Sequence, residues 1–269
     1  MANPKGCKYF SVGDVRKNND GDEFKIVEYI NSQNVVIEWS CGQRDVVQSA
    51  NIRSGGISYY NRITVQGVGY LGYGRFVHGN RKLKDGQMVI PNHLHRHWRH
   101  LISRTHGNKP DRYEDATMDS KWYNLQNFLE WAVNQIGNSN REENGRYWCI
   151  DKDILVEGNK HYSENTCVFA PNDINVFFAK QEIGNTGYLG VNYIKPATKG
   201  AKEGYVARCH SEGVRQYLGY YNTPQEAYLA YREAKIKVAN DLAIKWKGQV
   251  DDRVIEALLN FEERLPTTL

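Results

Sequence analysis

The sequence predicts an α+β protein that is built from several small modules. Residues 9 to 54 alternate short β-type runs with turn residues, which indicates a small β module. Residues 147 to 178 follow the order strand, loop, strand, helix. Residues 187 to 246 contain three β-type runs and then a well-specified helix start. A chain of 269 residues has room for two or three such modules.

The composition is that of a globular protein with much polar surface, since the mean hydropathy is −0.68. No run approaches the roughly 20 apolar residues of a membrane span, and no signal peptide opens the chain, so we expect an intracellular protein with no membrane partner. The five cysteines show no C-x-x-C spacing, which argues against a disulfide framework and a zinc ribbon. The net charge is only +4, but residues 183 to 248 hold ten basic and five acidic residues. This local excess favours a nucleic-acid contact region.

The N-terminal residues 1 to 54 predict a small all-β module. Residues 25 to 30 (KIVEYI) and 34 to 39 (NVVIEW) predict two strands that flank a turn. The pattern resembles a small β-barrel of the SH3 or KOW kind, which contacts nucleic acid or protein, or else serves as a structural cap. Residues 55 to 92 form a Gly/Tyr-rich connector, and its tyrosines favour an ordered segment that packs against a neighbouring domain.

Two helices are expected before the central stretch. From His93 onward, Leu94, Trp98 and Leu101 recur at helical spacing. Four histidines share this helix: His93, His95, His97 and His100. Because no H-E-x-x-H pattern or nearby cysteine supports zinc, we favour a phosphate-facing cluster over a metal site. Arg104 follows one turn later and can pair with a phosphate. Residues 122 to 133 (WYNLQNFLEWAV) predict the second helix, with its aromatic residues in the core.

The central stretch carries a carboxylate and an amide that can share a cation. Asp151 ends the first apolar run, and Asn175 lies at the start of the helical segment. One oxygen from each can hold a hard divalent cation, which leaves other positions for water and phosphate. Each residue also has a structural alternative, because an aspartate caps turns and an asparagine caps helices.

The run from residue 151 to 175 reads DKDILVEGNKHYSENTCVFAPNDIN. It resembles the ββα-metal core (HNH, or His-Me finger) of phage homing-type endonucleases. The resemblance implies a nuclease-like domain over residues 93 to 182 and one Mg²⁺ or Mn²⁺ per active site, held by Asp151 and Asn175. It also implies DNA contacts from the loop that contains Asn159 and Lys160.

Lys152 stands where this family has the histidine that activates water. A free lysine titrates at about 10.4, so it is a poor general base near neutral pH. Three alternatives remain open. An adjacent metal lowers the pKa of Lys152, or Asp153 or His161 acts as the base, or no base is left and the core only binds DNA.

Residues 183 to 248 resemble the APETALA/ethylene-response-factor type of DNA-binding domain. The resemblance rests on GVNY (190–193), GYVAR (204–208), YLGYYNTPQEA (217–227) and AYREAK (230–235). Thr223 and Glu226 form a capping box around Pro224, which specifies the helix start. In that family the sheet enters the major groove, which implies DNA contacts from five residues here: Asn192, Tyr193, Lys195, Arg208 and Arg215. The first strand departs from the family because it lacks the arginines of plant members.

Residues 249 to 269 predict a short C-terminal helix that docks on the body of the protein or pairs with a second copy, so the oligomeric state is open. Together, the resemblances imply a homing-type HNH endonuclease that cuts double-stranded DNA with one divalent cation and no small-molecule cofactor. If the chain is phage-encoded, it acts in the host cytoplasm. The alternatives are a DNA-binding protein that has lost cleavage, such as a repressor or replication accessory, and a phage adaptor built from interaction modules.

Overall fold

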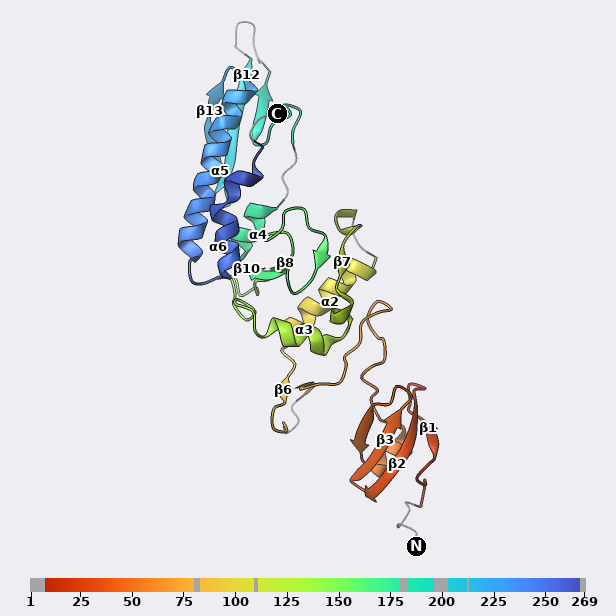
Figure 1. The fold of residues 1–269 in the computed structure, drawn as a ribbon. Helices are drawn as coiled ribbons and strands as arrows, with labels where there is room; N and C mark the ends of the chain where they lie inside the picture. Colours follow the sequence, from red (N-terminus) through yellow and green to blue (C-terminus); the bar gives the residue numbers. More distant parts are fainter. Residues whose placement is uncertain are drawn as a thin grey trace. The chain divides into compact units, whose positions relative to one another are not determined.

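The computed structural model describes residues 8–79, 83–108, 111–179, 183–195, 203–211 and 213–266. The chain forms two compact units (Figure 1). The first contains the residues up to Ile63 together with Tyr70–Tyr73, and the second contains Thr64–Gly69 and the chain from Gly74 onward. The segment predicted as a connector is therefore divided between the two units.

The first unit is an open antiparallel sheet. Its strands are β1 (Val15–Lys17), β2 (Glu23–Asn31), β3 (Asn34–Trp39) and β4 (Arg44–Val47), followed by α1 (Ser49–Ser54). The predicted barrel is wrong: the sheet order is β1-β2-β3-β4, so the short outer strands remain at opposite edges instead of pairing.

A compact core on one face of this sheet replaces barrel closure. Alternate residues of β2 and β3 point into it, and Ile52 of α1 covers them. Tyr59 and Tyr73 of the predicted connector pack against this core, and the hydroxyl of Tyr73 donates to Asp45 Oδ2 at 2.9 Å. The expectation of an ordered, packed segment is confirmed for these two tyrosines.

The second unit contains the two predicted helices. In α2 (Asn92–His106) the predicted apolar positions are buried. The other helix is divided into η2 (Ser120–Tyr123) and α3 (Leu125–Ala132), because Asn124 caps α3 by accepting the Gln126 N–H at 2.9 Å. The indole of Trp98 donates to the carbonyl of Trp122 at 2.6 Å, which ties the two helical segments together.

Three short strand pairs accompany these helices. β5 (Phe76–Val77) runs parallel to β6 (Met88–Val89), and β7 (Thr117–Met118) runs parallel to β9 (His161–Tyr162). β8 (Cys149–Asp151) is antiparallel to β10 (Val168–Ala170), and α4 (Asn172–Phe178) follows. A single-turn helix, η1 (Asp111–Tyr113), lies between α2 and β7. The order strand, loop, strand, helix that the sequence predicts is confirmed in β8, β10 and α4.

The C-terminal part is a three-stranded antiparallel sheet that packs on a long helix. β11 (Val191–Ile194), β12 (Gly204–Ser211) and β13 (Val214–Tyr221) pair in that order. The helix α5 (Pro224–Trp246) begins at the predicted capping box, in which Thr223 and Glu226 bond each other's backbone N–H groups. Tyr228 and Tyr231 of α5 pack with Ala207 and Cys209 of β12 in one buried cluster.

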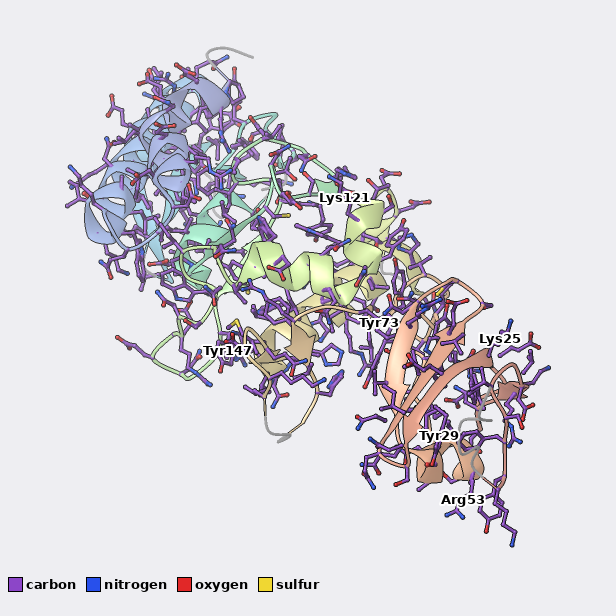
Figure 2. All side chains as sticks on the ribbon, turned by 60° about the horizontal axis from the view of Figure 1, so that its bottom comes forward. Lys25, Tyr29, Arg53, Tyr73, Lys121 and Tyr147 are labelled. Carbon is purple, nitrogen blue, oxygen red and sulfur yellow. The ribbon has the colours of Figure 1, made fainter. Side chains whose placement is uncertain are left out.

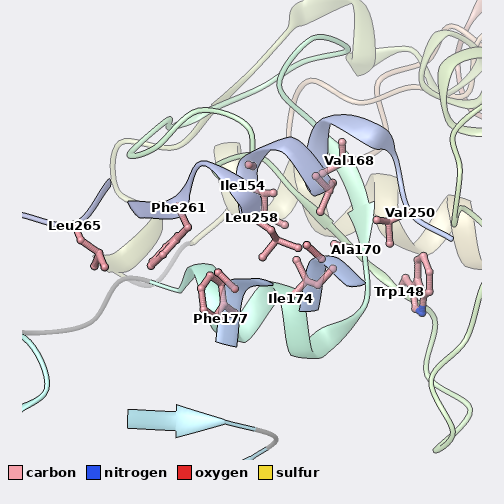
Figure 3. Packing of buried hydrophobic residues seen from close by; sticks show 14 residues of the cluster. Trp148, Ile154, Val168, Ala170, Ile174, Phe177, Val250, Leu258, Phe261 and Leu265 are labelled. Carbon is pink, nitrogen blue, oxygen red and sulfur yellow. The ribbon is translucent and has the colours of Figure 1, made fainter. Parts of the chain in front are cut away.

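The second half of α5 packs on a different core, which surrounds β8, β10 and α4. Ala239 and Ala243 join Val168 and Ile174 there. The chain then folds back through α6 (Asp252–Leu259) and η3 (Phe261–Arg264), which cover α4 (Figure 3). The C-terminal helix therefore docks on the body of the protein. In the described ranges, no helix has the length and apolar character needed to cross a membrane.

We expect Leu258→Ala to lower the free energy of unfolding of this unit by about 2 to 5 kcal/mol, because Leu258 is fully buried in the core and its loss leaves a cavity. The neighbouring Leu259 is 57% exposed, so Leu259→Ala is the matched control, with an expected change below about 0.5 kcal/mol. Urea denaturation of the two variants measures the difference. Equal losses of stability would show that α6 does not pack as described.

Lys235 lies between the two cores that α5 joins. Its ammonium donates to the carbonyl of Phe177 near the end of α4 at 3.1 Å and lies 3.8 Å from the centroid of the Phe177 ring. Burial lowers the pKa of Lys235 to about 8, because the charged form loses its hydration.

The lowered pKa of Lys235 predicts a rise in stability with pH. Between about pH 8 and the ordinary lysine value of 10.5, the unfolded chain binds a proton that the folded chain has released. The free energy of unfolding is therefore expected to rise across this range, and to rise less in Lys235→Met. Denaturation at several pH values tests this. Parallel pH profiles for the two proteins would contradict the prediction.

Candidate active site and nucleic-acid interface

Asp151 is the last residue of β8, and its position follows from the strand pairing. It lies opposite Val168 of β10, and paired residues share one face of an antiparallel ladder. Val168 packs against Ile174 of α4 in the core. The carboxylate of Asp151 is therefore on the face of the strand pair that α4 covers.

The Asp151 side chain also shapes the loop that follows it. Its Oδ1 accepts the backbone N–H groups of Asp153 at 2.8 Å and of Ile154 at 2.9 Å. This is the turn-capping role expected of an aspartate. Ile154 is fully buried, so the turn is anchored on the core. The structural role uses one oxygen of Asp151 and is compatible with a ligand on the other.

The carboxyl groups of Asp151 and Asp153 lie together. The pKa of Asp151 is raised to about 6. Burial is the main cause, and the hydrogen bond to the Asp153 carboxyl and its negative charge contribute in the same direction. Lys152 is only 7% exposed, and its ammonium lies 3.2 Å from Asp153 Oδ2 and 5.6 Å from the ring centroid of Tyr162. The site is thus two carboxyls and one ammonium from three consecutive residues.

Asn175 is not joined to this group by any described contact. It lies in α4 next to the buried Ile174, and its side chain is half-buried. Within the described parts of the chain, its side-chain amide makes no hydrogen bond to protein, whereas its backbone N–H donates to the Pro171 carbonyl at 3.0 Å. In the same parts, no set of three or more His, Cys, Asp or Glu residues could hold a metal. That Asn175 and Asp151 together bind one cation stays a prediction. The fold brings a different possible metal ligand, the carboxyl of Asp153, beside Asp151.

The loop between β8 and β9 is held by Asn159. Its amide nitrogen donates to the carbonyls of Lys152 at 2.7 Å and His161 at 2.8 Å, and its Oδ1 accepts the His161 N–H at 3.1 Å. The side chain predicted to contact DNA is therefore occupied in shaping the loop. Lys160, between Asn159 and His161, is exposed.

The His161 ring is bonded outside the carboxyl group. Its Nδ1 lies 2.9 Å from the hydroxyl of Thr117 on β7, beside the parallel pairing of β7 with β9. No described contact links it to Asp151 or Asp153. Of the two alternatives to Lys152 as the base, Asp153 has its carboxyl beside that of Asp151, and His161 is bonded elsewhere.

Arg104 reaches the same region from α2. It hydrogen bonds to Tyr162, and its guanidinium lies 5.2 Å from the ring centroid of Tyr113. Burial raises the pKa of Tyr162 to about 12, so its hydroxyl stays protonated. Tyr162 therefore has the Arg104 guanidinium near its hydroxyl and the Lys152 ammonium near its ring.

Three residues predicted to contact DNA share the face of the three-stranded sheet that α5 does not cover. Val191 of β11 packs on α5. Its neighbour Asn192, which pairs with Val206 of β12, therefore points to the other face of the sheet. Arg215 donates to Asn192 Oδ1 at 3.1 Å. Arg208 follows Ala207, which packs toward α5, and lies on the same open face as Asn192. The shift in register between Ala207 and Arg208 marks a β-bulge at this point. The open face carries these polar side chains and two exposed tyrosines: Asn192, Arg208, His210, Arg215, Tyr217 and Tyr220.

Tyr193 does not share that face. It pairs with Tyr205, which packs against the α5 cluster, and the two rings are 5.6 Å apart. The Tyr193 hydroxyl donates to Glu203 at 2.5 Å. Strand alternation puts neighbouring residues on opposite faces, so Asn192 and Tyr193 cannot both contact one ligand surface. Lys195 follows β11 and is exposed.

A cleft of about 1550 Å³ separates the end of this sheet from α4 and the loop before β8. Asn192, Arg208 and Arg215 line one wall, and Asn172 and Val176 line the other. Sequence reasoning missed the cleft because its walls come from segments far apart in the chain. It brings the polar sheet face and the helix of the candidate active site to one opening.

No protein-family model, curated protein or solved structure matches this chain.

Proposed function

We propose that this protein binds duplex DNA and cuts a phosphodiester with one divalent cation, as phage HNH homing-type endonucleases do. The observation that carries the proposal is the position of Asp151. It ends the first strand of an antiparallel pair, on the face covered by the helix that follows the second strand. This is where a ββα-metal site holds its cation.

DNA binding is supported by the open sheet face. Arg208 and Arg215 are free of ion pairs in the described residues, and Arg215 is oriented by Asn192. Unpaired guanidinium groups on an exposed sheet are suited to phosphates and to base edges in the major groove. Exposed Tyr217 and Tyr220 add apolar contact area.

The donor set fits a small hard cation such as Mg²⁺ or Mn²⁺. The Asp151 and Asp153 carboxyls are hard oxygen ligands that lie together, so both could hold such a cation. When bound, the cation would polarise the scissile phosphate and stabilise the leaving oxygen. Lys152 pairs with Asp153 as an ammonium, so we assign the proton-accepting role to Asp153 and the charge-stabilising role to Lys152.

One observation favours a second function. The buried Lys152 ammonium already neutralises the carboxyl pair, as a cation would. A DNA-binding protein that has lost cleavage, such as a repressor or a replication accessory, would keep that arrangement.

Supercoiled plasmid distinguishes the two functions. We expect the full-length protein with Mg²⁺ or Mn²⁺ to relax or linearise the plasmid, and EDTA to prevent this. Plasmid that is retained by the protein in a mobility-shift gel but never broken, with either metal, would establish the second function instead.

A further inference from the structure

A basic pocket lies on α2, next to the cleft, with which it shares Arg141 and Asn144. Its volume is about 710 Å³, and α2 forms one wall while the loop of residues 141–147 forms the other. Three arginines and three histidines line it: His93, Arg96, His97, His100, Arg141 and Arg146. No aspartate or glutamate is among the described lining residues. A concave site of one charge sign attracts an anion.

The spacing on α2 explains why these side chains converge. His93, His97 and His100 recur every three or four residues, so they form one stripe, while Leu94 and Trp98 bury the adjacent stripe. Burial and the nearby arginines lower the pKa of all three histidines, that of His97 to about 4. The arginines therefore supply the positive charge near neutral pH.

The second wall is a tight, ordered turn. Arg141 pairs with Tyr147 in an antiparallel bridge, and the Glu142 N–H donates to the Arg146 carbonyl at 2.8 Å. Gly145 takes a φ of +79°, which other residues rarely adopt, and the Arg146 N–H donates to Asn144 Oδ1 at 3.0 Å. The arginines of this wall are thus presented by a fixed backbone.

Tyr147 is not available for stacking on a nucleotide base. Its ring, labelled in Figure 2, stacks on His93, with centroids 4.2 Å apart and planes 10° apart. The Arg141 guanidinium lies 3.8 Å from the same centroid and also bonds the Tyr147 hydroxyl. The His93 ring and the Arg141 guanidinium both lie within contact distance of the ring centre, so they must lie on opposite faces of the Tyr147 ring. Both faces are therefore occupied. The guanidinium groups of Arg96 and Arg146 remain as the recognition elements, and they suit phosphate.

The stripe on α2 continues from the pocket toward Asp151. Arg104 lies one turn beyond His100 and bonds Tyr162. Its positive charge also acts to lower the pKa of the Cys149 thiol, against the larger effect of burial. Cys149 is two residues before Asp151 in β8. A strand that passes from the pocket along this stripe would reach the carboxyl pair.

We propose that this pocket binds backbone phosphates of the DNA strand that leads to Asp151, through Arg96 and Arg146. Arg141, which donates to the Gly145 carbonyl at 2.8 Å and bonds Tyr147, adds positive charge to the pocket. The proposal rests on the proposed DNA binding, but it concerns residues that neither the sheet face nor the carboxyl pair contains. It assigns to α2 the task of holding the strand that flanks the cleavage position.

The test compares three arginines in the full-length protein bound to a fluorescent duplex of about 30 base pairs. Arg96→Ala and Arg146→Ala are each expected to weaken binding about three- to tenfold, and to lower the slope of log K against log salt by about one. Arg99 is exposed on α2 but does not line the pocket, so Arg99→Ala is the matched control with an unchanged slope. Identical slopes for Arg96→Ala, Arg146→Ala and Arg99→Ala would overturn the proposal.

A second measurement separates this proposal from the sheet face. Inorganic phosphate is titrated into the DNA-free protein while the histidine ring protons are followed by NMR. Shifts in wild type that are lost in the Arg96→Ala/Arg146→Ala double variant support the pocket even if Arg208→Ala leaves DNA binding unchanged. Such shifts without any effect on duplex binding would overturn nucleic acid as the ligand. The absence of shifts, together with unchanged duplex affinity, would overturn the site itself.

Discussion

Asp151→Asn is expected to reduce metal-dependent DNA cleavage at least about a thousandfold while leaving duplex affinity within about twofold. Asparagine keeps an Oδ1 that can accept the Asp153 and Ile154 N–H groups, so the turn after β8 is preserved. It removes the negative charge that would hold the cation. A cation contributes several kcal/mol of charge stabilisation in such reactions, and about 1.4 kcal/mol corresponds to a factor of ten in rate. Timed plasmid nicking at saturating protein measures the loss.

Glu157→Gln is the matched control for this substitution. Glu157 is exposed in the same loop, so its change removes one carboxylate without touching the carboxyl pair. We expect normal nicking from this variant and an unchanged melting temperature in both. Nicking that persists in Asp151→Asn at the wild-type rate would place the chemistry elsewhere in the protein.

Arg208→Ala combined with Arg215→Ala is expected to weaken duplex binding about ten- to a hundredfold. Both guanidinium groups lie on the sheet face that α5 leaves open, and each lost phosphate contact lowers the salt slope by about one. Fluorescence anisotropy at several salt concentrations gives both quantities. Cleavage should fall in parallel and recover at high protein concentration, because the carboxyl pair is intact.

Lys237→Ala controls for the general loss of positive charge. Lys237 is exposed on α5, the helix that covers the opposite face of the sheet. Its removal should change duplex affinity by less than about twofold. The contrary outcome is a salt slope that falls by the same amount for each positive charge removed, in Lys237→Ala as in the double variant. DNA binding would then depend on the net charge of the protein rather than on this face of the sheet.

The features that the sequence predicts well are those with local causes. The start of α5 follows from Thr223, Pro224 and Glu226, which satisfy the first backbone groups of the helix without help from the rest of the chain. The buried stripe of α2 follows from spacing alone. Asp151 at a strand end likewise follows from the apolar run before it.

The features that the sequence predicts poorly depend on contacts between distant segments. A barrel was expected over residues 1 to 54, but closure requires the edge strands to meet, and Ile52 and Tyr59 cover the core instead. The sequence of residues 141 to 147 does not predict that Arg141 and Arg146 line one pocket with the histidines of α2. Their partners are about 45 residues earlier in the chain.

The candidate site shows the same division. Asp153 was predicted only as one possible base, yet it is the group that the turn brings to Asp151, because a side chain two residues away can fold back onto it. Asn159 was predicted to contact DNA, and the structure uses it to close the loop. The resemblance places Tyr193 with Asn192 on the DNA face, but alternation along β11 puts their side chains on opposite faces of the sheet.

The packing of α6 and η3 on α4 sets limits on how the protein can be divided for study. Ile174 and Phe177 of α4 are covered by Leu258 and Phe261, which follow the sheet in the chain by many residues. A recombinant fragment that stopped after α4 would expose this apolar surface to water and would tend to aggregate. Expression trials of the carboxyl-bearing region should therefore carry the chain through Leu265, with the sheet included as a folding partner.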